Sequence, residues 1–116
     1  MKKTEIQQFG ISFNLYVYTS NDYVSNIILR EKSWETGETK AILSALRNYK
    51  EKHGIKNLND VLFLDIGAQI GWHSLVAASH GFKVMAFEPM EKSQYLFRRN
   101  ICFNRSLDII NINKGL

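Results

Sequence analysis

The sequence is poor in several features that would restrict its class. It has one cysteine, Cys102, among 116 residues, so no disulfide can form within the chain, which favours a reducing compartment. It has one proline and no low-complexity tract, which is typical of a folded chain. No apolar run approaches the roughly 20 residues that span a bilayer, and no signal-peptide core follows the basic N-terminus. We therefore expect a cytoplasmic protein with one modest hydrophobic core.

The chain has a globular composition with a small excess of positive charge. Hydrophobic residues make up 45% and charged residues 22% of the sequence, and the formal net charge is +4. The cationic side chains are interleaved with eleven acidic ones, a pattern typical of a solvated surface. We therefore interpret Arg98, Arg99 and Arg105 as a solvated helix face, with contact to phosphate as the alternative. A nucleic-acid partner is not expected.

The first half of the chain changes its hydrophobic period. Alternation over residues 9–18 predicts a half-buried strand, a polar turn cluster occupies 19–22, and β-branched residues at 24–29 suggest the second strand of a hairpin. Apolar residues on one helical face then predict a helix over 36–53. We expect residues 1–58 to form an N-terminal segment of hairpin plus helix.

The second half alternates between strand and helix patterns. In chain order, the expected strand, helix, strand, helix and strand lie at 61–64, 71–80, 83–87, 91–104 and 109–112. The first strand is continuously apolar, which is typical of a strand buried on both faces. Strands that alternate with helices indicate parallel βαβ units. The predicted fold class is therefore α/β, with a Rossmann-like sheet over residues 59–116.

The most informative stretch runs from Leu64 to Gly71. A buried strand ends in Asp65, a glycine turn follows at Gly67, and a helix begins. In open parallel sheets, ligands bind beyond the carboxyl ends of the strands. Gly67 allows a sharp turn and a close ligand approach, and the helix start offers unpaired N–H groups. The alternative is that both glycines serve only turns and packing.

A second acidic residue ends the next strand. Glu88 lies 17 residues after Gly71, where a carboxylate can accept hydrogen bonds from the vicinal hydroxyls of a ribose. The alternative role is an ordinary acid at a helix N-terminus. A dinucleotide site is disfavoured, because the G-x-G-x-x-G pattern needs glycine where Gln69 and Trp72 stand. An NAD-dependent oxidoreductase is therefore the weakest alternative.

Two strings of the sequence resemble a known enzyme family. LDIGAQIGWHSLVAASHGFKVMAFEPM and LFRRNICFN are similar to the FkbM-type family of class I S-adenosylmethionine-dependent methyltransferases. Members show an acid–x–Gly–Ala–Asn–x–Gly loop, an aromatic–x–Glu–Pro motif and a helix with spaced asparagines, here Asn100 and Asn104. Gln69 stands where the family usually has asparagine. The resemblance covers most of the chain, and residues 61–104 carry its specificity.

The resemblance implies a site for S-adenosylmethionine. It would place Asp65 near the methionine amino group, Gly67, Ala68, Gln69 and Gly71 along the methionine and ribose, Glu88 on the ribose hydroxyls, and Pro89 and Met90 beside the adenine. The implied reaction is methyl transfer to a hydroxyl of a small molecule or glycan. No residue is assigned as catalytic, and no His, Cys or Asp spacing resembles a metal site.

A complete class I methyltransferase domain has seven strands, and this sequence predicts the first three of them. We therefore expect an incomplete copy, the alternative being a non-catalytic binding module on the same scaffold. The open sheet edge and its apolar surface predict poor solubility or self-association.

Several side chains near the motif have two interpretations. His73 is a candidate general base, although contact with the cofactor or packing is the more common role for such a histidine. Trp34 is either an aromatic anchor or, with Glu35, part of a segment that closes over the cofactor. Cys102 is expected to lie in the core.

Overall fold

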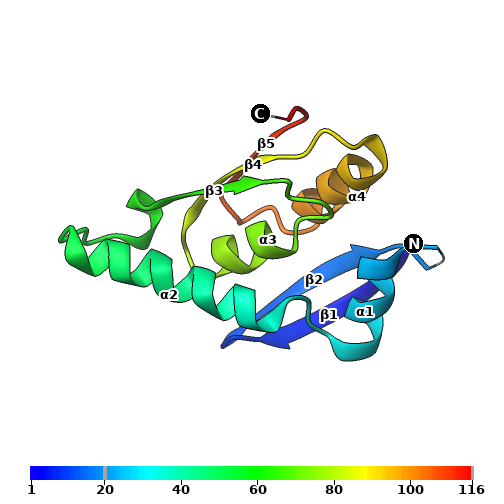
Figure 1. Ribbon diagram of the computed structural model, residues 1–116, viewed down its shortest axis with the longest axis horizontal. Coiled ribbons are helices and arrows are strands. Elements are labelled where there is room, and N and C mark those ends of the chain that lie inside the picture. The colour runs from blue at the N-terminus through cyan, green and yellow to red at the C-terminus, as the bar shows by residue number, and fades with distance from the viewer. Residues whose placement is uncertain (20, 116) are drawn as a thin grey trace.

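The computed structural model describes residues 1–19 and 21–115 (Figure 1). In chain order its elements are β1 (Lys2–Gln8), β2 (Ile11–Val17), α1 (Tyr23–Glu31), α2 (Thr36–Lys52), the 3₁₀ turn η1 (Leu58–Asp60), β3 (Leu62–Ile66), α3 (Trp72–Ser79), β4 (Lys83–Phe87), α4 (Glu91–Cys102) and β5 (Ile109–Ile112). The predicted alternation of strands and helices in the second half is confirmed. Ser20, in the predicted turn, and Leu116 lie outside the described residues.

The second half forms a parallel sheet in the order β3-β4-β5. In Figure 1, α3 and α4 lie between this sheet and the hairpin, while α2 runs along one side. The carboxyl ends of β3 and β4 are neighbours, because Ile66 pairs with Phe87. This arrangement confirms the predicted α/β fold class with a Rossmann-like parallel sheet.

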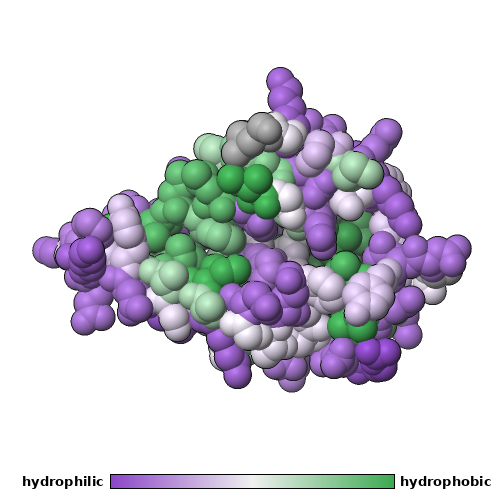
Figure 2. Space-filling view, viewed as in Figure 1, coloured by the Kyte–Doolittle hydropathy of each residue, from purple (hydrophilic) through white to green (hydrophobic). Residues whose placement is uncertain are grey.

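One face of the parallel sheet is uncovered in the described chain. Leu62, Leu64 and Ile66 of β3 are 47%, 51% and 59% exposed, while Asp65 between them is buried. The pairing aligns Leu64 with Met85 and Met85 with Ile110, so apolar side chains cross all three strands. Figure 2 shows the resulting hydrophobic area over β3 and the adjoining part of α2. The prediction that β3 is buried on both faces is therefore wrong for this chain.

The hairpin at the N-terminus differs from the predicted one. β2 pairs with β1, upstream of it, and the connection is Phe9–Gly10, whose φ angles of 56° and 75° suit a two-residue hairpin turn. Residues 24–29, predicted as the second strand, lie in α1. The strand at β1 escaped the sequence pattern because Ile6 is its single apolar residue.

A side-chain cap explains why α1 is a helix. The Asp22 carboxylate accepts a hydrogen bond from the Ser25 N–H at 3.0 Å, which satisfies a donor at the helix start. Ile28 of α1 is fully buried, and Val24 is packed against the same core. The cap and this burial outweigh the strand preference of the β-branched residues.

The predicted helix over residues 36–53 is confirmed as α2. Gly54 follows it with φ of +62°, and its N–H donates to the Glu51 carbonyl at 3.2 Å. The Ile55 N–H donates to the Lys50 carbonyl at 2.9 Å, which completes the hydrogen-bond pair of a Schellman motif. Within the described residues, no helix is long and apolar enough to cross a membrane.

Candidate functional site

The loop after β3 is held against the end of β4. The N–H groups of Gly67 and Ala68 both donate to the Phe87 carbonyl, at 2.8 and 3.1 Å. Gly67 has φ of +77°, and a Cβ built there would meet no atom within 4 Å. The main chain at Gly67 is thus open to a ligand, as the close-approach interpretation of this glycine requires.

Glu88 joins the loops that follow β3 and β4. Its side chain is 3% exposed. One carboxylate oxygen accepts the Gln69 N–H at 2.7 Å, and the other accepts the Met90 N–H at 2.8 Å. Each oxygen of a carboxylate has a second acceptor site. Glu88 is therefore fixed in position and can still accept a hydroxyl hydrogen at each oxygen.

A surface hollow of about 360 Å³ lies over these two loops. It is lined by Asp22, Val24, Gly67, Gln69, Ile70, Glu88, Met90 and Ser93. The structure thus brings together four of the predicted site residues, Gly67, Gln69, Glu88 and Met90. Asp22 and Val24 also line the hollow and come from the N-terminal segment. They were not predicted from the sequence, because residues 19–22 were interpreted only as a turn between two elements.

Asp65 lies beneath the loop and does not line this hollow. Its carboxylate accepts a hydrogen bond from the Ser74 hydroxyl at 2.6 Å. Burial raises the pKa of Asp65 above its ordinary value of 3.8, while the Ser74 hydrogen bond and the nearby His73 ring oppose the rise. The site therefore holds a buried acid whose charge is costly unless a cation lies close to it.

Gly71 has a packing role. A Cβ at this position would lie 2.3 Å from Cδ1 of Phe97, and its φ is +98°. Only glycine fits this close approach of the loop to α4, so the structure favours the packing interpretation of Gly71. Pro89, like Gly71, is absent from the lining of the hollow.

A second, smaller hollow of about 50 Å³ also borders the Gly67–Ile70 loop, and Ala68 lines it. Trp34 and His73 line it too. The His73 Nε2 is 3.2 Å from a Glu35 carboxylate oxygen, and the Nδ1 is 3.4 Å from the Thr39 hydroxyl. Since both ring nitrogens have partners, the structure favours the contact-and-packing interpretation of His73 over the general base.

Asn100 and Asn104 fix the hairpin to the site. The buried Asn100 amide accepts the Tyr16 N–H at 2.6 Å and donates to the carbonyls of Tyr16 and Ile70, both at 3.1 Å. The Asn104 amide donates to the Asn14 carbonyl at 2.8 Å. These two side chains, on α4 and its C-terminal turn, therefore complete the hydrogen bonds of the β2 edge, and Asn100 also holds the backbone of the loop after β3 at Ile70.

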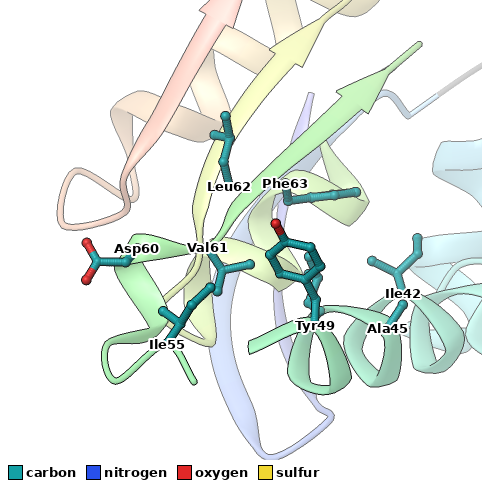
Figure 3. A pocket seen from close by; sticks show the side chains of 9 residues that line it. Ile42, Ala45, Tyr49, Ile55, Asp60, Val61, Leu62 and Phe63 are labelled. Carbon is teal, nitrogen blue, oxygen red and sulfur yellow. The ribbon is translucent and has the colours of Figure 1, made fainter. Parts of the chain in front are cut away.

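Two further features lie away from the loops after β3 and β4. One is Cys102, and the other is a hollow larger than the one beside Glu88. Cys102 is exposed on α4, so the prediction that it lies in the core is wrong. A hollow of about 480 Å³ between α2 and β3 is mostly apolar, with Tyr49 and Phe63 on its walls (Figure 3). Its single charged lining residue is Asp60, so it offers no group of converging polar atoms for a nucleoside. No cluster of three or more metal-ligating side chains occurs among the described residues.

Comparison with known proteins supports the fold. No protein-family model matches the sequence, and no curated protein matches it. The structure is similar to the crystal structure of a SAM-dependent methyltransferase from Agrobacterium tumefaciens, with a TM-score of 0.61 and 17% sequence identity. The match covers 99% of this chain and 33% of that chain, so this chain spans about a third of its length. The described residues therefore have the Rossmann-like α/β fold found in that part of a methyltransferase.

Proposed function

We propose that this chain forms the cofactor-binding part of an FkbM-type, S-adenosylmethionine-dependent methyltransferase. The observation that carries the proposal is the Glu88 carboxylate, which two backbone N–H groups hold at the carboxyl end of the parallel sheet. It lies beside the open backbone of Gly67, in the position where α/β sheets bind nucleosides.

The described residues fit the cofactor. Glu88 would accept the two ribose hydroxyls, and the exposed Met90 side chain, with Pro89, would flank the adenine. Asp65, which lies beneath the hollow, would be near the methionine ammonium group, directly or through water, since a cation nearby offsets the cost of its buried charge. The loop from Gly67 to Gly71, with Ala68 and Gln69, would follow the methionine and ribose.

Methyl transfer to a hydroxyl of a small molecule or glycan is the proposed reaction. Bound S-adenosylmethionine supplies an electrophilic methyl group. The chain contributes orientation, because holding the reactants in line accounts for much of the rate of such a transfer. The alternative is a binding module without catalysis on the same scaffold. The division into residues 1–58 and 59–116 stays a prediction.

Calorimetric titration with S-adenosylhomocysteine tests the proposal. Glu88→Ala should weaken binding by about tenfold or more, because hydrogen bonds to a charged group contribute about 1.5–3 kcal/mol each. Glu51→Ala, at an exposed acid on α2, is the matched control and should bind like the unmodified chain. A folded chain that shows no saturable binding would overturn the proposal.

A further inference from the structure

The segment that comprises α4 and the turn after it has a local excess of positive charge. Residues 91–105 contain four cationic side chains and one acidic side chain, Glu91, whereas the whole chain has a net charge of +4. Arg98, Arg99 and Arg105 are all exposed. Residues 40–56 contain five cationic side chains and one acidic one, so the charge excess alone does not distinguish this segment from the rest of the surface.

Aromatic side chains lie among these arginines. A surface hollow of about 380 Å³ is lined by Tyr95, Arg98, Arg99, Cys102 and Phe103, which we call the α4 arginine surface. Tyr95 and Phe103 are 47% and 50% exposed. They are eight residues apart, or about 12 Å along the helix axis, so the two arginines lie between exposed rings.

The arginines of this surface have no acidic partner within the described chain. No described carboxylate lies within 4.0 Å of Arg98 or Arg99. The Arg99 guanidinium lies 5.8 Å from the ring centres of both Tyr16 and Phe103, which hold it by cation–π attraction. Lys92 differs, because it lies 4.0 Å from the Asp22 carboxylate. The guanidinium groups are thus positioned, and their charge is not neutralised.

We propose that the α4 arginine surface binds single-stranded nucleic acid. Unpaired arginines attract phosphates, and exposed rings beside them provide stacking surfaces for bases. An acidic protein segment would use the arginines and leave the rings without a role. The sequence alone favoured a solvated helix face, because it could not show that Phe103 and Tyr16 gather around Arg99. The proposal does not rest on methyl transfer.

Fluorescence anisotropy with a labelled single-stranded oligouridine tests this inference across a series of salt concentrations. The double variant Arg98→Gln, Arg99→Gln should bind more weakly, and the slope of log K against log salt should fall by about 1.4. Tyr95→Ala should lose about tenfold in affinity through lost stacking. The control Lys52→Gln, Lys56→Gln removes the same charge from an exposed surface near the end of α2 and should keep both affinity and slope.

Two results would overturn the inference that this surface binds single-stranded nucleic acid. Equal loss in the lysine control would mean that net charge alone drives binding. Tight binding of heparin or anionic vesicles with no effect of Tyr95→Ala would instead indicate a surface for polyanions or lipid headgroups. Circular dichroism of each variant checks folding, and titration with S-adenosylhomocysteine should be unchanged in all of them. Loss of nucleic-acid binding is therefore distinguishable from loss of the cofactor site.

Discussion

At the scale of single residues, the two buried carboxylates near the loop, Glu88 and Asp65, have different surroundings. Glu88 accepts hydrogen bonds from two backbone N–H groups of different loops, whereas Asp65 accepts its hydrogen bonds from Ser74. Burial therefore raises the pKa of Asp65, and the charged form of this side chain destabilises the fold in the absence of a ligand cation.

Replacing Asp65 should change how the free energy of unfolding depends on pH. Because the folded pKa is raised, the contribution of Asp65 to stability is greatest below its ordinary pKa of 3.8 and is lost as pH rises through the folded value. Asp65→Asn should remove this pH dependence, so the variant should gain stability relative to the unmodified chain as pH rises towards neutrality. Urea denaturation at several pH values measures the difference, and a difference that is constant with pH would contradict the account.

Gln69 has a left-handed backbone conformation, which asparagine adopts more readily than glutamine. Its φ is +54° and its side chain is exposed. Asparagine tolerates this left-handed region better than glutamine. Gln69→Asn should therefore raise the free energy of unfolding by about 0.5 kcal/mol, as measured by chemical denaturation. Gln7→Asn, in the extended backbone of β1, should give no gain, and an equal gain there would contradict the explanation.

The sequence predicted the individual site residues unequally well. The positions of Gly67 and Glu88 followed from where a strand ends, because the carboxyl ends of adjacent parallel strands meet. The packing role of Gly71 against Phe97 could not be predicted, since it depends on how closely α4 approaches the loop. The exposure of Cys102 depends in the same way on which side of α4 faces the core.

At the element scale, α4 is fixed to β2 by side-chain amides. Asn100 pairs with the backbone of Tyr16 as a neighbouring strand would, and Asn104 continues the contact at Asn14. The spacing of these asparagines was visible in the sequence. Their partners were not, because β2 lies more than 80 residues earlier in the chain.

Removing one of these amides should destabilise the fold. Asn100→Ala leaves the Tyr16 N–H and the Ile70 carbonyl without their partner, at a cost of about 1–3 kcal/mol. Asn48→Ala, at an exposed asparagine of α2, is the control and should be neutral or slightly stabilising. Equal free energies of unfolding for the two variants in guanidinium would contradict this role of Asn100.

Local sequence signals predicted the βαβ elements better than the hairpin. Each strand of the parallel sheet is a short apolar run between turns, so its position follows from its own residues. β1 has few apolar residues, and its assignment depends on pairing with β2. α1 depends on the Asp22 cap, which competes with a run of β-branched residues.

At the scale of the whole molecule, the uncovered sheet face should drive self-association of the 116-residue chain. Leu64 lies in the apolar row that crosses the sheet, and β3 has one unpaired edge within the described residues. Leu64→Lys should reduce association, as measured by sedimentation velocity over a range of concentrations. Tyr23→Lys, at a 73% exposed ring on α1, is the control. A monomer at every concentration would contradict this prediction.

Cofactor binding at the ends of β3 and β4 is the central claim, and backbone amide NMR tests it most directly. We expect titration with S-adenosylhomocysteine to shift the amide signals of Gly67, Ala68, Gln69 and Met90 in a saturable manner. The amides of β1 and of the C-terminal half of α2 should not change. No shift in a folded chain, or shifts confined to the hollow between α2 and β3, would contradict the account.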